Sequence, residues 1–216
     1  MAVITDVVIV AVLLAGIVLG ARRGLLQSLA GVIVVVLAFF CAAWVARHFA
    51  DPVARWLQPI LEQTLTSKIQ SQTPATASAG DMLQLFGFSG RSLTELIEAV
   101  TARAIQTGRT LLEEVVGSVI HSIAYALLYV LSFFVIYLLL KLLLKPLDLA
   151  SKLPGLRTLN GLGGAALGFI ESALLLYLVV WALRKLQLVI TPQLIEESMF
   201  LKIFVNYSPI SLITSL

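Results

Sequence analysis

The sequence predicts an all-α membrane protein with four transmembrane helices and additional amphipathic helices at the membrane interface. Hydrophobic residues make up 59% of the 216 residues and charged residues only 12%, whereas soluble domains contain about 45–50% and about 25% of these classes. Four stretches stay apolar over about 20 residues, the length of helix that crosses a hydrocarbon core of about 30 Å. A soluble domain of this size could not bury so much apolar surface.

The first two stretches predict a transmembrane hairpin in residues 1–46, with spans at about 3–21 and 25–46. Arg22 and Arg23 follow the first apolar stretch, whereas a signal peptide carries its basic residues in front of the apolar stretch. We therefore interpret residues 22–24 as the turn of a hairpin.

The other two spans are expected in residues 115–190, at about 115–140 and 162–183. The link between them is basic, with one acid, Asp148, against four basic residues: Lys141, Lys145, Lys152 and Arg157.

Short basic loops stay in the cytoplasm. The sequence therefore predicts that loops 22–24 and 141–160 are cytoplasmic and that the N-terminus, residues 47–114 and the C-terminus lie outside. Arg184 and Lys185 do not fit this orientation.

Residues 47–114 are expected to form extracytoplasmic amphipathic helices and a flexible linker, and no compact domain. Asp51 and Pro52 fit a helix start, with Asp as the N-cap and Pro in the first turn. Apolar residues then recur at helical spacing up to Leu65. Thr66 to Gly80 is rich in Ser, Thr, Gln and Ala and predicts the flexible linker.

Two further amphipathic helices are expected. Ser92 and Glu95 have the spacing of a capping box, and the helix that follows is expected to continue into span three as one rod. Thr191 and Pro192 fit the start of an interfacial helix in residues 191–216.

Two short motifs are typical of enzymes, but we give each a structural interpretation. Gly87-Phe88-Ser89-Gly90 matches the GxSG motif of intramembrane serine proteases but lies in a polar connection, where a turn is expected. Gly161 to Ala166 matches the GxGxxA form of a dinucleotide fingerprint but opens a membrane span and follows no strand. The lone Cys41 excludes an internal disulfide, and no metal-ligand spacing is present. We therefore predict a non-enzyme without cofactor or metal.

Glycines are interpreted as helix-packing positions, because a residue without Cβ lets two backbones approach closely. Spans one and four both carry a Gly-x-x-x-Gly pair. The predicted packing residues are Gly16, Gly20, Gly24, Gly161, Gly164 and Gly168.

Charged residues within or beside the spans are the candidate functional residues: Asp6, Arg22, Arg23 and Glu171. A carboxylate at the bilayer centre costs about 2.5–3.5 kcal/mol on insertion scales. Asp6 is near enough to the end of its span to reach water or to serve as an N-terminal cap. Glu171 is deeper and is expected to be protonated, to face a polar cavity, or to pair with a residue of span three: Ser118, Tyr125, Tyr129 or Ser132. A structural hydrogen bond and a role in ion or solute passage both remain open for Glu171.

The order of these parts resembles the colicin V production protein family of bacterial inner membranes. The residues that carry the resemblance are Asp6, Arg23-Gly24-Leu25, Leu159-Asn160-Gly161-Leu162-Gly163-Gly164, and the stretch from Ile195-Glu196-Glu197-Ser198 to Ser208-Pro209. The chain departs from the family pattern at Glu171-Ser172, where a basic residue and Gly are common, and at the uncharged Gln27-Ser28.

The resemblance implies a multi-pass protein of the bacterial plasma membrane with an accessory role in the production or export of colicin V-type toxins and in envelope homeostasis. A small oligomeric channel or transporter, with a polar path near Glu171, is the alternative. The expected partners are membrane lipid and either further copies of the chain or other membrane proteins. Nucleic acid is not expected as a partner, because the sequence contains no long basic run.

Overall fold

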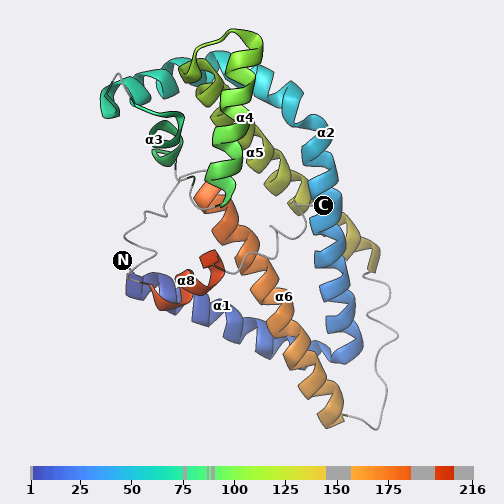
Figure 1. Cartoon of the computed structure of the whole chain (residues 1–216). Coiled ribbons are helices and arrows are strands. Elements are labelled where there is room, and N and C mark those ends of the chain that lie inside the picture. The colour runs from blue at the N-terminus through green and yellow to red at the C-terminus, as the bar shows by residue number, and fades with distance from the viewer. Residues whose placement is uncertain are drawn as a thin grey trace. The chain divides into compact units, whose positions relative to one another are not determined.

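The computed structural model of the chain describes residues 2–74, 77–86, 88, 91–144, 157–185 and 198–206. Every element in these ranges is a helix (Figure 1). Four helices are long and apolar enough to cross a membrane: α1 (Ala2–Arg23), α2 (Leu25–Gln72), α5 (Leu111–Leu144) and α6 (Arg157–Lys185). Three shorter helices complete the described chain: α3 (Ala79–Gln84), α4 (Arg91–Thr107) and α8 (Met199–Asn206). The predicted all-α class with four long apolar helices is confirmed.

The helices group into two units. The first combines Met1–Val45 with Tyr129–Leu183 and Leu188–Leu216, and the second combines Ala46–Leu128 with Arg184–Gln187. The first unit therefore contains α1, the start of α2, the end of α5, most of α6, and α8. The second contains the end of α2, α3, α4 and the start of α5.

Helix α2 does not begin again at Asp51 and Pro52, so the predicted helix start there is wrong. The helix continues through Pro52 and Pro59 to Gln72. Each proline lacks the N–H for one helical hydrogen bond. Apolar packing on both sides of the prolines offsets this loss, since Ala46, Ala50, Leu65 and Ile69 are all buried.

The predicted linker over Thr66–Gly80 is mostly helical. Its first part is about the last two turns of α2, where Ile69 enters the core. Its end is the start of α3, which has a capping box. The Ser78 side chain accepts from the Asp81 N–H, and Asp81 accepts from the Ser78 N–H at 3.0 Å. Composition alone favoured a linker, and tertiary burial of a few apolar residues overrode it.

The predicted continuous rod from Ser92 into span three is also wrong, because the chain turns between α4 and α5. Gly108 has φ +68°, a left-handed conformation that ends a helix. Thr110 then caps α5. Its hydroxyl accepts from the Glu113 N–H, and Glu113 accepts from the Thr110 N–H, both at 3.3 Å. Helix α4 begins at Arg91, so Ser92 lies inside it rather than before it.

The second unit has its own hydrophobic core, contrary to the expectation that residues 47–114 form no compact domain. Helices α2, α3, α4 and α5 contribute to it. Its fully buried members are Ile69, Leu83, Val100, Val115, Val119 and Ile120. The amphipathic faces predicted for these segments therefore pack on one another within this unit.

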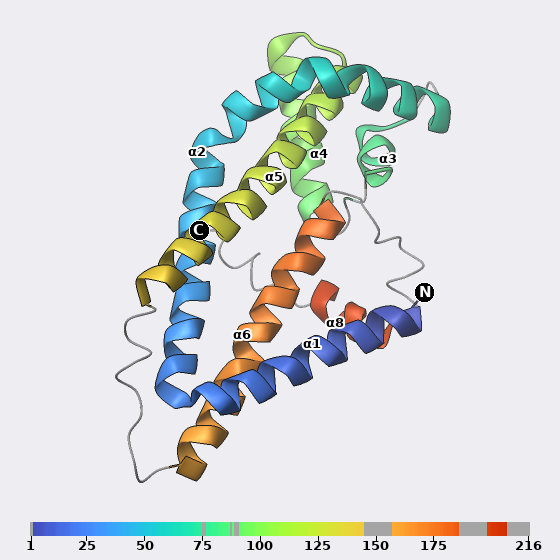
Figure 2. The same cartoon turned by 180° about the vertical axis from the view of Figure 1, so that it is seen from behind.

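In the first unit, α8 lies beside α1 in both views (Figures 1 and 2). Leu201 of α8 is 1% exposed and packs with Ile9 of α1 and with Leu176 and Val180 of α6. The interfacial helix expected at the C-terminus is therefore partly a packing element. Its predicted start at Thr191 and Pro192 lies outside the described residues.

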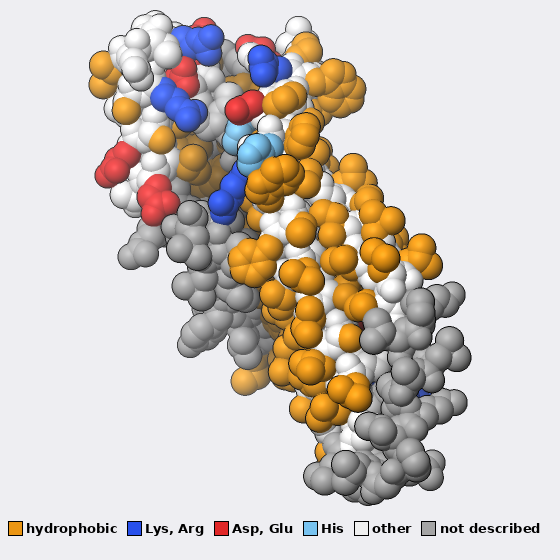
Figure 3. Space-filling view, turned by 90° about the vertical axis from the view of Figure 1, so that its right-hand side faces the viewer, with side chains coloured by type: hydrophobic (Ala, Val, Ile, Leu, Met, Phe, Trp, Pro, Cys, Tyr) orange, Lys and Arg blue, Asp and Glu red, His pale blue; other side chains and the backbone are white. Residues whose placement is uncertain are grey.

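The apolar helices expose much of their hydrophobic surface. Leu131, Leu138 and Leu142 of α5 are each more than 60% exposed. Figure 3 shows hydrophobic side chains covering a large continuous area along α2 and α5. Water would not stabilise such an area, and lipid or apolar protein partners would.

Candidate functional site

The centre of the candidate site is Glu171, which lies about halfway along the apolar segment of α6 and is 6% exposed. Arg23 reaches it from the last turn of α1. Arg23 Nη1 donates to Glu171 Oε2 at 3.5 Å, and the Arg23 side chain keeps 33% exposure. An acid that would be costly in lipid is therefore buried beside a guanidinium that still reaches solvent.

Helix α5 contributes the other polar contact of Glu171. Tyr137 Oη donates to Glu171 Oε1 at 3.4 Å, and Lys141 Nζ donates to Tyr137 Oη at 2.8 Å. The Lys141 ammonium also lies 4.9 Å from the centroid of the Tyr137 ring, within the range of a cation–π interaction. The four side chains form one polar chain, Lys141–Tyr137–Glu171–Arg23, across α5, α6 and α1.

Helix α2 makes room for the carboxylate. A Cβ added to Gly31 would lie 2.7 Å from Glu171 Oε2, so a side chain at this position would displace the acid. The site thus depends on a glycine, two cations and a tyrosine from three other helices.

The predicted pairing of Glu171 with Ser118, Tyr125, Tyr129 or Ser132 is wrong. Its partner on α5 is Tyr137, and its cation is Arg23. The sequence marked Arg23 both as a turn residue and as a candidate functional residue, and it gave Lys141 only as a basic residue of the link. It did not indicate Tyr137 or Gly31. The Tyr137 and Lys141 pair at i and i+4 near the end of span three was the available signal, because such residues share one helix face.

Helices α1 and α6 touch through their backbones. A Cβ on Gly20 or on Gly164 would overlap the carbonyl oxygen of the other residue, and a Cβ on Gly168 would overlap the Gly16 carbonyl. The four glycines therefore form a close helix–helix contact of the Gly-x-x-x-Gly type. Gly161 differs, since its nearest contact would be the Ala21 carbonyl at 3.8 Å, an ordinary distance.

The hairpin turn is held by α6. Gly24 has φ +87° and packs on the Asn160 side chain. Asn160 Oδ1 accepts from the Leu25 N–H at 2.6 Å and so caps the first turn of α2. The buried Ser28 Oγ donates to the Gly20 carbonyl at 3.2 Å, which ties α2 to α1. Asn160 and Ser28 were not singled out from the sequence as site residues.

Asp6 caps the N-terminus of α8. Its carboxylate accepts from Ser198 Oγ at 2.5 Å and from the backbone N–H groups of Met199 and Phe200 at 3.3 and 3.2 Å. A negative charge stabilises the positive end of a helix dipole. Asp6 therefore holds α8 against α1, whereas Arg22 is exposed and makes no ion pair with any residue that the structure describes.

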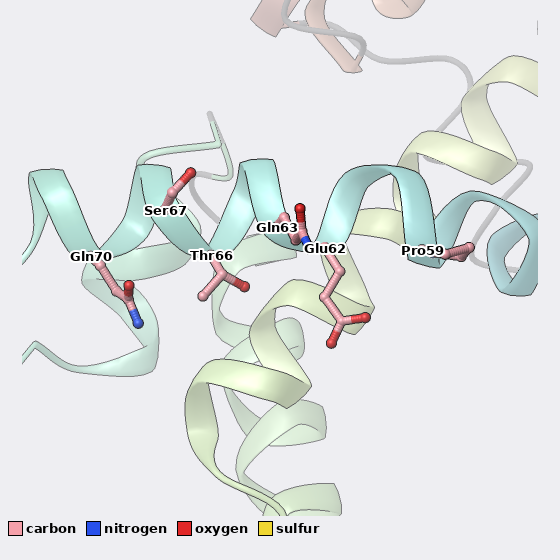
Figure 4. Close-up of a pocket in the computed structure, with 6 residues that line it drawn as sticks. All are labelled: Pro59, Glu62, Gln63, Thr66, Ser67 and Gln70. Atoms are coloured by element: carbon pink, nitrogen blue, oxygen red, sulfur yellow. The ribbon is translucent and has the colours of Figure 1, made fainter.

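A hollow along α2 carries no candidate site. Figure 4 shows its lining: Pro59, Glu62, Gln63, Thr66, Ser67 and Gln70. All six come from one helix, and Ser67 and Glu62 point to opposite sides of it. The Ser89 of the GxSG motif lies outside the described residues. Among the residues that the structure describes, no group of three or more His, Cys, Asp or Glu side chains could hold a metal ion.

The positions that carry the family resemblance meet in pairs. Asp6 contacts Ser198, and the Arg23–Leu25 turn contacts Asn160, Gly163 and Gly164. A family model described as "Colicin V production protein" matches residues 5–128 and 99–209. The chain belongs to the colicin V production protein family. No curated protein and no solved structure matches it significantly.

Membership of the colicin V production family agrees with the four long apolar helices, since the family consists of bacterial membrane proteins. The residues at which the sequence was expected to depart from the family pattern lie where helices meet. Glu171 pairs with Arg23, Ser172 packs on Gly16, and Ser28 ties α2 to α1. An acid therefore lies among the contacts of α1, α5 and α6.

Proposed function

We propose that this member of the colicin V production family is a multi-pass accessory protein of the bacterial plasma membrane. It supports the production or export of a colicin V-type toxin and envelope homeostasis, and it acts through helix–helix contacts without catalysing a reaction.

The observation that supports this proposal best is the polar chain around Glu171. Lys141, Tyr137, Glu171 and Arg23 bind one another across three helices, which supports a role in holding the helices together. Among the residues that the structure describes, apolar helix faces such as the exposed leucines of α5 are available to other molecules. Apolar faces without a covering element suit lipid, a second copy of the chain or another membrane protein.

Complementation in a strain that makes a colicin V-type toxin tests the proposal. The chain's gene is deleted and replaced by the wild type, by Gly20→Ala or by Gly161→Ala, and released toxin is measured as growth inhibition of a sensitive strain. We expect loss of release on deletion, recovery with the wild type and Gly161→Ala, and failure with Gly20→Ala. Normal toxin release from the deletion strain would refute the proposed role.

The alternative is an oligomeric channel with a polar path near Glu171. The polar chain of titratable groups is the feature that favours it. Reconstitution of the purified chain in liposomes separates the two functions. A channel that uses this path should show a conductance that Glu171→Gln changes, whereas an accessory protein should show none in either form.

We also propose the topology, with residues 22–24 and 141–160 in the cytoplasm. In a Cys41→Ser background, a thiol reagent that cannot cross the membrane should label Ser71→Cys but not Arg22→Cys in spheroplasts. Labelling of Arg22→Cys alone would show that the chain has the opposite orientation in the membrane.

A further inference from the structure

A second polar cluster lies in the second unit, away from Glu171. It is a hollow of about 370 Å³ between one face of α2, the C-terminal part of α4 with the turn after it, and one face of α5. Its polar lining consists of Asp51, Arg55, Gln58, Arg103, Arg109, Glu114, Ser118 and His121. We propose that this hollow binds the phosphate group of an anionic phospholipid.

The charges of the hollow favour an anion. Three arginines face two carboxylates, which leaves a formal charge of +1 before any charge on His121. Both carboxylates already have partners: Glu114 Oε1 lies 3.9 Å from Arg109 Nη1, and Asp51 Oδ1 lies 3.1 Å from His121 Nε2. Arg55 and Arg103 make no ion pair with any residue that the structure describes. A phosphodiester carries one negative charge and would balance the net charge of +1, and guanidinium groups bind phosphate oxygens well.

The hollow is built into the fold. Gly108, with φ +68°, turns the chain so that Arg109 follows α4 and lies beside the start of α5. A Cβ on Gly117 would meet no atom within 4 Å, so the space beside this glycine is open. Glu114 is 8% exposed and accepts from Thr107 Oγ1 at 3.2 Å, which fixes the wall of the hollow.

The position of the hollow in the sequence indicates a membrane lipid as the source of the phosphate. Its α2 residues follow directly after the apolar stretch that ends at Ala46, and its α5 residues lie where that helix becomes apolar. Helix α2 exposes Trp56 at 69% and α4 exposes Ile105 at 81%, and tryptophan favours the headgroup level of a bilayer. Figure 3 shows histidine, basic and acidic side chains gathered beside exposed hydrophobic ones.

Lipid titration followed by native mass spectrometry tests this site in the full-length protein in neutral detergent. We expect phosphatidylglycerol to bind more tightly than phosphatidylcholine, whose choline offsets the phosphate charge. Because each arginine near a lipid surface contributes about 1 kcal/mol, Arg55→Gln with Arg103→Gln should weaken phosphatidylglycerol binding roughly 30-fold. Arg22→Gln, which removes an exposed arginine of the other unit, is the matched control and should bind as the wild type does.

Gly117→Leu provides a second variant that keeps all charges and fills the open space. It should also weaken phosphatidylglycerol binding, and circular dichroism checks that each variant is folded. Equal binding by the wild type and the folded double-arginine variant would overturn the proposal. Displacement of the lipid by inorganic phosphate at matching concentrations would overturn the lipid assignment, since acyl chains would then contribute nothing.

Discussion

Asp6 and Ser198 are 192 residues apart in the chain, yet the Ser198 hydroxyl donates to the Asp6 carboxylate at 2.5 Å. This contact joins the start of α1 to the start of α8. It turns an acid near the end of a membrane span into the cap of another helix, because the Met199 and Phe200 N–H groups also donate to Asp6. Two of the stretches that carry the family resemblance therefore meet in one structural element.

Replacing Asp6 should release α8. We expect Asp6→Ala to destabilise the docked helix, because the first N–H groups of α8 lose their side-chain acceptor. Faster amide exchange in Met199–Asn206, with α6 unchanged, is the measurement. Asp6→Asn keeps an acceptor and should have a smaller effect; equal exchange in all three proteins would contradict the capping role.

Breaking the pair of Arg23 and Glu171 should destabilise the first unit. Arg23→Gln leaves a buried carboxylate without its cation. We expect this to lower the free energy of unfolding by roughly 3 kcal/mol. This value is at the low end for buried pairs, because Arg23 is partly exposed. Denaturant unfolding in detergent micelles measures this loss. The double variant Arg23→Gln/Glu171→Gln should recover most of it, because no charge then remains buried, and Arg22→Gln should cost little. An additive double-mutant cycle would show that the two residues do not interact.

The close glycine contact between α1 and α6 predicts different thermal stabilities for two Gly→Ala substitutions. Gly20→Ala places a methyl group on the Gly164 carbonyl, whereas Gly161→Ala meets its nearest atom at 3.8 Å. Overpacking of this kind costs about 1–3 kcal/mol. Thermal unfolding should therefore show a lower Tm for Gly20→Ala and a nearly unchanged Tm for Gly161→Ala. Similar values for both variants would argue against a backbone contact of α1 with α6.

The capping box of α3 predicts that the stability of this short helix depends on pH. The hydrogen bonds from the Ser78 side chain and backbone lower the pKa of Asp81 from its ordinary value of 3.8. Since the folded-state pKa is the lower one, the stabilisation is complete above pH 3.8 and is lost as pH falls through the depressed value. Amide protection in α3 should decline in that acidic range in the wild type. Asp81→Asn should lack this decline, and the same decline in Asp81→Asn would assign it to another group.

Patterns within one segment predicted the membrane helices well. The apolar stretches gave the four long helices, and the short turn at Gly24 follows from the basic pair and glycine between two such stretches. Local patterns failed where burial decides, as at Asp51 and Pro52, which look like a helix start but lie inside α2. The expected linker at Thr66 likewise became helical, because Ile69 is buried in the core of the second unit.

The sequence by itself determined the all-α class, the long apolar helices and the positions of Glu171 and the glycines, because composition and periodicity act along one segment. Only the tertiary structure decided that Glu171 pairs with Arg23 and Tyr137, that Asp6 caps α8, and that three arginines line one hollow. These relationships join residues far apart in the chain. The physical reason is that a buried charge or an uncapped helix end takes the partner that packing brings to it, and no local pattern records which partner that is.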